Sequence, residues 1–381
     1  MVAYADDVTI LIEAPSRKDI EAAAKTTLNA VAAWGARNRL EFSPAKSVTM
    51  TMRGRLQRAP TVRLAGDSVR SVTSTMVLGV VLDTSLSFVQ HAISIGERAA
   101  KCFGKMSRVS ASSWGIRYPG LRVLYRGTFV ATVTYAAACW YRRATLHAVR
   151  SALLRCQRPS LILLTKAYRS TSTAALAVLG GVLPADLEVI RAGRYDEERL
   201  AAADAQVELT LRRRELDRRK REIWNEVMKV WQKRWTNEEK GRELYRFFPD
   251  VAARLSSNWV VPDYQLSQML TGHGCFRKRL YDMKLCEVSL CYCGMEEEDL
   301  HHVLWVCPLY EEDRRKMMDG IARADAGPVY YPDLVSSPAN FERLRDFAHR
   351  WHAARSAMER QERLEGEGGQ RGSYIAQLQS T

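Results

Sequence analysis

At the beginning of the chain, short runs of apolar residues alternate with polar residues. Two of these runs, rich in small, β-branched and aromatic residues, flank the adjacent carboxylates Asp6 and Asp7. The pattern predicts two strands joined by a turn that contains both aspartates. Apolar residues at helical spacing then predict an amphipathic helix over 16–39, with Ser16 as its N-cap.

Further strands are predicted after that helix. The segment 40–52 alternates between apolar and polar residues after a turn at Ser43–Pro44, and 74–88 holds two apolar runs with Gly79 between them. Alternation of this kind is typical of strands, and a glycine inside it marks a kink or a close approach of the backbone. Residues 1–90 are therefore predicted to form half of a compact α/β domain.

The rest of the chain has mainly helical spacing. From 91 to 190 it is interrupted at Pro119–Gly120, Pro159 and Gly180–Gly181, where helices are predicted to break. The segment 196–241 predicts one long, highly charged helix whose charges pair with one another in solvent. Its apolar face carries three tryptophans, Trp224, Trp231 and Trp235. The chain as a whole is thus predicted to be α+β.

Composition narrows the class of protein. With 381 residues, 46% of them hydrophobic, the chain is long enough for two or three globular domains. The longest apolar stretch, 128–140, is too short to span a bilayer, and no secretion signal pattern is visible. Five of the eight cysteines gather late in the chain, which in an intracellular protein favours a metal site over disulfides. They are Cys275, Cys286, Cys291, Cys293 and Cys307.

The formal charge of +14 comes from one segment of the chain. Between Glu97 and Asp186 there is no acidic residue, while the remainder of the chain is balanced. A long segment of one sign is typical of a polyanion-binding surface, and nucleic acid is favoured here over an anionic membrane or an acidic protein partner. The cations are Arg98, Lys101, Lys105, Arg108, Arg117, Arg122, Arg126, Arg142, Arg143, Arg150, Arg155, Arg158, Lys166 and Arg169.

A cysteine and histidine cluster has the spacing of a zinc site. Cys291 and Cys293 are one residue apart, and His302 and Cys307 have four residues between them, a separation that fits a helical turn. Gly294 would let the chain turn so that both sulfurs face one tetrahedral ion. Buried thiols beside a surface histidine are the structural alternative. Other ligands also remain open: His301 in place of His302, and Cys286 or Cys275 as additional donors.

The adjacent carboxylates Asp6 and Asp7 admit two interpretations. The simpler interpretation is a surface turn, because aspartate is common in turns. Two like charges held closely, however, repel each other unless a cation or a proton relieves them. They could therefore be half of a metal site for phosphoryl or nucleotidyl transfer.

An ordered set of motifs extends over nearly the whole chain. YADD and a helix are followed by RLEFSPAKS and VLGVVLD, then by AYRSTSTAALAVLGGVLPADL, WQKRWTNEEKGRELYRFFPDV and LTGHGCFRKRL. In this order they resemble the carboxy-terminal part of the reverse transcriptase in the pol polyprotein of insect non-LTR (LINE-type) retrotransposons. The resemblance is greatest to the type-1 elements that insert into ribosomal RNA genes.

The resemblance implies roles for residues near the start of the chain. Asp6 and Asp7 would bind two Mg²⁺ ions in the palm of an RNA-directed DNA polymerase, with Tyr4 near the primer end. Lys46 would supply a proton or charge to the leaving pyrophosphate. A further pair, Leu78 and Gly79, would lie in the strands that grip the primer backbone.

The resemblance also implies an order of domains. It gives a palm portion over 1–90, a basic helical thumb over 91–195, a charged helical connection over 196–265, a CCHC zinc knuckle over 266–315 and a helical tail over 316–381. The glycine-rich end of the tail is expected to fray. In the thumb, an RNA–DNA hybrid would be held by cations through its phosphates. Those singled out are Arg122, Arg126, Arg142 and Arg143.

The resemblance further implies that parts of the complete enzyme precede Met1. The family's polymerase uses another palm aspartate, fingers and an upstream endonuclease, so Met1 is expected to mark a truncated frame or a fragment boundary. The fragment alone is expected to be inactive. The complete enzyme would use an RNA template, a DNA primer and dNTPs in target-primed reverse transcription, in the nucleus after cytoplasmic synthesis.

Two other functions are weighed against this one. The first is a nucleic-acid-binding module without chemistry, formed by the thumb and a knuckle with one structural zinc. The second is a restriction-like nuclease that uses Asp333 and Asp346 after the knuckle, for which the sequence around Asp333 gives only a faint match.

Overall fold

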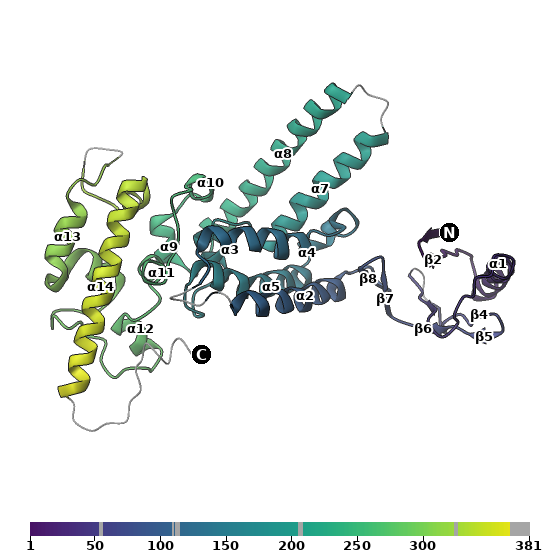
Figure 1. Ribbon diagram of the computed structural model, residues 1–381, viewed down its shortest axis with the longest axis horizontal. Coiled ribbons are helices and arrows are strands. Elements are labelled where there is room, and N and C mark those ends of the chain that lie inside the picture. The colour runs from purple at the N-terminus through teal and green to yellow at the C-terminus, as the bar shows by residue number, and fades with distance from the viewer. Residues whose placement is uncertain (53–55, 109, 111–114, 205–208, 324–326, 366–381) are drawn as a thin grey trace. The chain divides into compact units, whose positions relative to one another are not determined.

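The computed structural model describes residues 1–52, 56–108, 110, 115–204, 209–323 and 327–365 (Figure 1). The chain forms two compact units, 1–94 and 95–381. Helices predominate over short strands. No helix among the described residues is both long enough and apolar enough to cross a membrane. The glycine-rich end that was expected to fray falls mostly at 366–381, outside the described residues.

The first unit contains helix α1 (Arg17–Arg37) and separate two-stranded sheets rather than one sheet among its described residues. The Ser16 side chain accepts a hydrogen bond from the backbone N–H of Asp19, which confirms the predicted N-cap. The strand pairs are β1 (Val2–Tyr4) with β2 (Asp7–Thr9), β3 (Val48–Thr49) with β6 (Arg70–Ser71), β4 (Arg63–Leu64) with β5 (Asp67–Ser68), and β7 (Ser74–Val77) with β8 (Val80–Asp83).

Both predicted hairpins form, with one correction at the first. Tyr4 lies opposite Asp7, so Asp7 begins β2 and only Asp6 lies in the turn, after Ala5 at a φ of +52°. The second hairpin turns at Leu78 and Gly79, both at positive φ, as a two-residue loop requires. In contrast, the strand predicted over 40–52 is limited to the two residues of β3, Val48–Thr49.

The second unit is built from helices. The order after α2 (Val89–Ser107), which crosses the boundary between the units, is α3 (Tyr118–Tyr125), α4 (Ala131–Val133), α5 (His147–Thr165), α6 (Thr173–Leu179), α7 (Ala185–Asp204), α8 (Leu209–Thr236), α9 (Arg242–Phe247), α10 (Val251–Ser256), α11 (Tyr264–Thr271), α12 (Arg277–Asp282), α13 (Glu311–Met318) and α14 (Pro338–Glu365). Short helical turns cover Arg126–Val130, Ala137–Cys139, Tyr141–Thr145, His302–Val306, Pro308–Tyr310 and Asp333–Val335.

The prolines behave differently from the prediction. Pro119 lies in the first turn of α3, which begins at Tyr118, because proline needs no N–H partner there. Pro159 lies inside α5, which continues through it to Thr165. The glycine break is confirmed, since Gly180 ends α6 and Gly181 has a φ of +56°.

The charged segment 196–241 is not one helix. Helices α7 and α8 lie side by side, and residues 205–208 between them fall outside the described part (Figure 1). On the predicted apolar face, Trp231 and Trp235 are buried, whereas Trp224 is 39% exposed. The sequence pattern could not show that this segment forms two helices, because both halves carry charges at helical spacing.

Candidate metal centre

Four predicted ligands converge in the second unit. One donor atom from each of Cys291, Cys293, His302 and Cys307 lies within 4.8 Å of the other three. The sulfurs of Cys291 and Cys307 are 3.6 Å apart, and Nε2 of His302 is 3.3 Å from the Cys293 sulfur. Two thiolates about 2.3 Å from a tetrahedral zinc lie about 3.8 Å apart, so the donor set and its spacing fit zinc.

Two short turns bring these ligands together. The N–H of Gly294 donates to the carbonyl of Cys291 at 2.9 Å, and Gly294 has a φ of +76° that favours glycine. On the other side, the helical turn His302–Val306 ends when the N–H of Cys307 donates to the carbonyl of His302 at 2.7 Å. The turn was predicted from Gly294 itself, and the helical turn from the spacing of His302 and Cys307.

A carboxylate that the sequence analysis missed orients the histidine. Nδ1 of His302 lies 3.3 Å from a carboxylate oxygen of Glu296, which leaves Nε2 facing the thiols. Such a carboxylate fixes the ring and its tautomer in many zinc sites. The acidic run before His302 was a signal, but the sequence could not tell which of its glutamates reaches the ring.

The protonation of the three thiols differs. Burial raises the pKa of Cys291 and of Cys307. Burial also opposes ionisation of Cys293, but hydrogen bonds from the Met295 backbone and from the neighbouring cluster side chains outweigh it and lower its pKa to about 7. A bound dication would favour the thiolate of all three.

A buried ion pair attaches the cluster to α14, a contact that the sequence did not reveal. Nε of Arg355 is 3.1 Å from a carboxylate oxygen of Glu298, and both side chains are at most 3% exposed. Arg355 also donates to the carbonyl of Cys275 at 3.0 Å. From α13, Arg314 donates to the carbonyl of Cys307 at 2.5 Å. The ligand loops are therefore held by two helices that follow them in the chain.

The alternative ligands lie outside the cluster. His301 is exposed, and its Nδ1 is 3.2 Å from the hydroxyl of Tyr331. Cys286 donates to backbone carbonyls, and Cys275 is fully buried. Among the described residues, neither cysteine joins a group of three or more converging donors.

The predicted polymerase residues lie on the surface of the first unit. Tyr4 is 67% exposed, and Asp6, Asp7 and Lys46 are exposed as well. Within the part of the chain that the structure describes, no third carboxylate or imidazole gathers with the two aspartates. Leu78 is exposed at the tip of its own hairpin.

The four arginines that were predicted to hold a hybrid in a thumb differ in their surroundings. Arg126 and Arg143 are exposed and have no carboxylate partner among the described residues. Arg142 pairs with Glu197 of α7 at 2.7 Å, an acid from outside the one-signed segment. Arg122 is half-buried and lines a pocket of about 440 Å³ together with Arg126.

The nuclease alternative gains no geometric support. Asp333 accepts a hydrogen bond from the N–H of Tyr330 at 2.8 Å and belongs to a helical turn, while Asp346 is exposed on α14. These two aspartates belong to no cluster of three potential metal ligands in the described ranges.

Comparisons with known proteins agree on one type of relative. The chain is 31% identical over 371 residues to the Retrovirus-related Pol polyprotein from type-1 retrotransposable element R1 4 of Nasonia vitripennis, covering 91% of this chain and 93% of the relative. It is 32% identical to the corresponding R1 polyprotein of Bradysia coprophila, covering 96% of this chain and 37% of that relative. It is also 32% identical to the Putative 115 kDa protein in type-1 retrotransposable element R1DM of Drosophila melanogaster, of which it covers 35%.

Protein-family models and solved structures give no match to the chain. The chain spans about a third of the length of the Bradysia and Drosophila relatives but nearly all of the first Nasonia relative.

Proposed function

This chain belongs to the Pol polyproteins of insect type-1 R1 retrotransposable elements, and from that membership we propose that it is a carboxy-terminal region of an RNA-directed DNA polymerase. Its task would be to hold the RNA template and DNA primer during target-primed reverse transcription in the nucleus. The observation that carries the proposal is the full-length similarity to R1 Pol polyproteins. The acid-free segment with fourteen cations supports it, because phosphates are bound through such charges.

In this proposal the Cys/His cluster holds one structural zinc. Three thiols and an imidazole complete a tetrahedron and leave no position for substrate, which suits a nucleic-acid-contacting module. Asp6 and Asp7 would bind Mg²⁺ only together with carboxylates from elsewhere in a complete polymerase. We therefore expect no primer extension by the 381-residue chain alone, as its described residues bring no third ligand to the pair.

Binding to an RNA–DNA hybrid tests the proposal. The variant Arg126→Gln/Arg143→Gln removes two exposed charges that form no ion pair among the described residues. Arg142 is left intact, since its loss would leave the carboxylate of Glu197 without its arginine partner. We expect weaker binding at low salt and a salt slope reduced by about 1 to 2, because each lost phosphate contact contributes about 0.9.

The matched control changes the charge equally at another place. Arg315→Gln/Lys316→Gln on α13 removes two exposed cations that pair with Glu312. If both variants weaken binding alike, only net charge matters and the thumb assignment fails. If the unaltered chain binds no nucleic acid at low salt, the proposal as a whole fails.

A further inference from the structure

A pocket of about 780 Å³ in the second unit combines free cations with hydroxyl groups. We call it the Ser/Thr groove, and define it by Arg158, Ser170, Thr171, Lys240, His273 and Arg279. Arg158 comes from α5, the hydroxyl residues from the loop before α6, and Arg279 from α12. The groove is separate from the metal centre and shares none of its ligands.

The charge of the groove is mostly uncompensated. Four cationic side chains and one carboxylate, that of Glu238, line it. Arg234 is paired with the buried Asp186 at 2.6 Å, but Arg158, Lys240 and Arg279 form no ion pair with a carboxylate among the described residues. Arg158 instead donates to the hydroxyl of Thr173 at 2.8 Å. A groove with this balance attracts anions.

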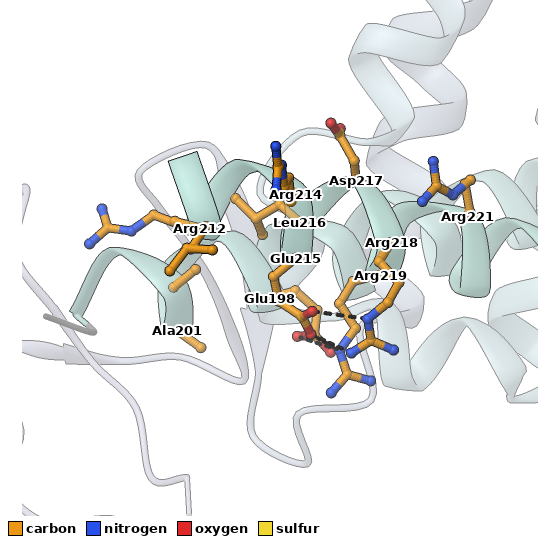
Figure 2. Close-up of a pocket in the computed structure, with 12 residues that line it drawn as sticks. Glu198, Ala201, Arg212, Arg214, Glu215, Leu216, Asp217, Arg218, Arg219 and Arg221 are labelled. Carbon is orange, nitrogen blue, oxygen red and sulfur yellow. Dashed lines mark hydrogen bonds and ion pairs between the residues drawn. The ribbon is translucent and has the colours of Figure 1, made fainter. Parts of the chain in front are cut away.

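Another arginine-rich pocket shows the opposite arrangement. Figure 2 shows the pocket between α7 and α8, of about 810 Å³, where Arg218 and Arg219 turn toward acids of the same helix pair. Arg219 lies 3.3 Å from Glu215 and 3.8 Å from Glu198, and Arg218 pairs with Glu215 as well. These cations are already neutralised within the protein, so arginine content alone does not make an anion site.

Two buried polar groups in the Ser/Thr groove lack partners. Thr171 is 1% exposed, and its hydroxyl has no hydrogen bond among the described residues. Nε of Arg279 is likewise buried without an acceptor. Buried donors are normally satisfied, because leaving one unpaired costs about 1–3 kcal/mol. Both residues line the groove, and the described residues supply no acceptor to either group.

The lowered pKa of His273 indicates that the electrostatic potential in the groove is positive. His273 lies 3.0 Å from the hydroxyl of Ser170. Burial, then the charges of Arg279 and Arg158, lower the pKa of His273 to about 4, so the ring is neutral at pH 7. The two guanidinium groups are thus close enough to oppose a further positive charge and to favour a negative one.

We propose that the Ser/Thr groove binds phosphate groups of a nucleic acid strand, with Arg279 and Lys240 pairing with the phosphates. This inference rests on the proposed function, and it adds a site outside the thumb arginines. Trp231 and Trp235 line the groove but are at most 3% exposed, so they offer no face for stacking on bases. The groove therefore contacts backbone and does not discriminate sequence.

The test uses the full chain, a fluorescent single-stranded RNA of mixed sequence and a salt titration. Lys240→Gln/Arg279→Gln is expected to weaken binding at least fivefold and to reduce the salt slope by about 1.4, at about 0.7 for each contact to a single strand. Arg218→Gln/Arg219→Gln, in the pocket of Figure 2, is the matched control and is expected to leave the slope unchanged. An unchanged slope in the groove variant overturns the inference.

A second variant separates binding from folding. Lys240 is exposed, and Lys240→Gln alone should leave the midpoint of thermal unfolding unchanged while reducing the salt slope by about 0.7. An unchanged slope in this variant would overturn the inference. A loss of binding with an unchanged midpoint cannot come from misfolding.

Two further outcomes keep the proposals distinct. If Arg126→Gln/Arg143→Gln weakens RNA binding and the groove variants do not, the groove inference fails while the proposed function stands. If the unaltered chain binds the RNA–DNA hybrid but no single-stranded RNA, the groove inference fails and the proposed function stands; if it binds neither, both fail. A labelled nucleoside triphosphate carries the same phosphate chemistry, so it is titrated in parallel. If a groove variant weakens binding of the triphosphate but not of the RNA, the inference that the groove binds a strand is overturned.

Discussion

The two predicted metal sites contrast in how their ligands are gathered. The Cys/His cluster brings four donors within 4.8 Å of one another, and three of its four ligands are buried. Asp6 and Asp7 are exposed in a two-stranded hairpin, and no third ligand joins them among the described residues. Both sites were predicted from short motifs, yet only one is assembled by the residues near it in sequence.

The difference follows from what each site has to do. A structural zinc is enclosed by soft donors that two tight turns can supply, so residues 291–307 suffice for its ligands. A two-metal site for nucleotidyl transfer needs hard oxygen ligands from several strands and open positions for substrates. If the two sites are of these kinds, the first is local in sequence, whereas the second would depend on distant segments.

Loss of the metal is expected to have the largest effect. Chelation, or Cys307→Ser, should reduce bound zinc from about one per chain to none, because zinc binding energy contributes to local folding. Hydrogen exchange should then speed up near 285–310 and stay unchanged over 1–90. Elemental analysis and exchange mass spectrometry measure both. Cys139→Ser, at an exposed cysteine outside the cluster, should keep the zinc.

Breaking the buried ion pair between the cluster and α14 should have the second largest effect. Arg355→Met leaves Glu298 buried without its partner, which should cost about 3–5 kcal/mol of unfolding free energy in urea. The control Arg345→Met removes an arginine paired with Glu342 nearer the surface of the same helix and should cost below about 1 kcal/mol. Equal costs would mean that α14 does not anchor the cluster.

Removing the carboxylate beside the histidine should have a smaller effect. Glu296→Gln should weaken zinc binding about tenfold, at the low end for such orienting carboxylates because Glu296 is exposed. Competition with a chromophoric chelator measures the affinity. Glu287→Gln, at the glutamate that precedes the first ligand loop, serves as the control. A zinc affinity equal to that of the unaltered chain would exclude an orienting role for Glu296.

The smallest effect on this chain should come from the aspartate pair. Asp6→Ala should change the unfolding free energy by no more than about 0.5 kcal/mol, as expected for an exposed position, and leave bound zinc unchanged. In a longer protein that shows primer extension and contains this chain, we propose that the same substitution abolishes the extension. Extension by the 381-residue chain alone would show that the active site is assembled differently.

Much of the local structure could be predicted from the sequence. The N-cap at Ser16, the hairpin turn at Gly79 and the turn at Gly294 each depend on a few neighbouring residues, and all three form. The choice of His302 over His301 could not be made from spacing alone. It follows from the helical turn before Cys307, which faces His302 inward while His301 meets Tyr331.

Features that join distant segments depended on tertiary structure. The pairing of Arg355 with Glu298, the compensation of Arg142 by Glu197 and the gathering of Thr171 with Arg279 each combine residues from separate helices or loops. Composition showed how many cations the chain has, but not which of them already have partners. The sequence by itself determined the candidate ligands, the cap and the turns, because these form through contacts between near neighbours. Only packing decided which charges are buried, paired or left for a ligand, since a charge's partner and its access to water are set by segments far away in the chain.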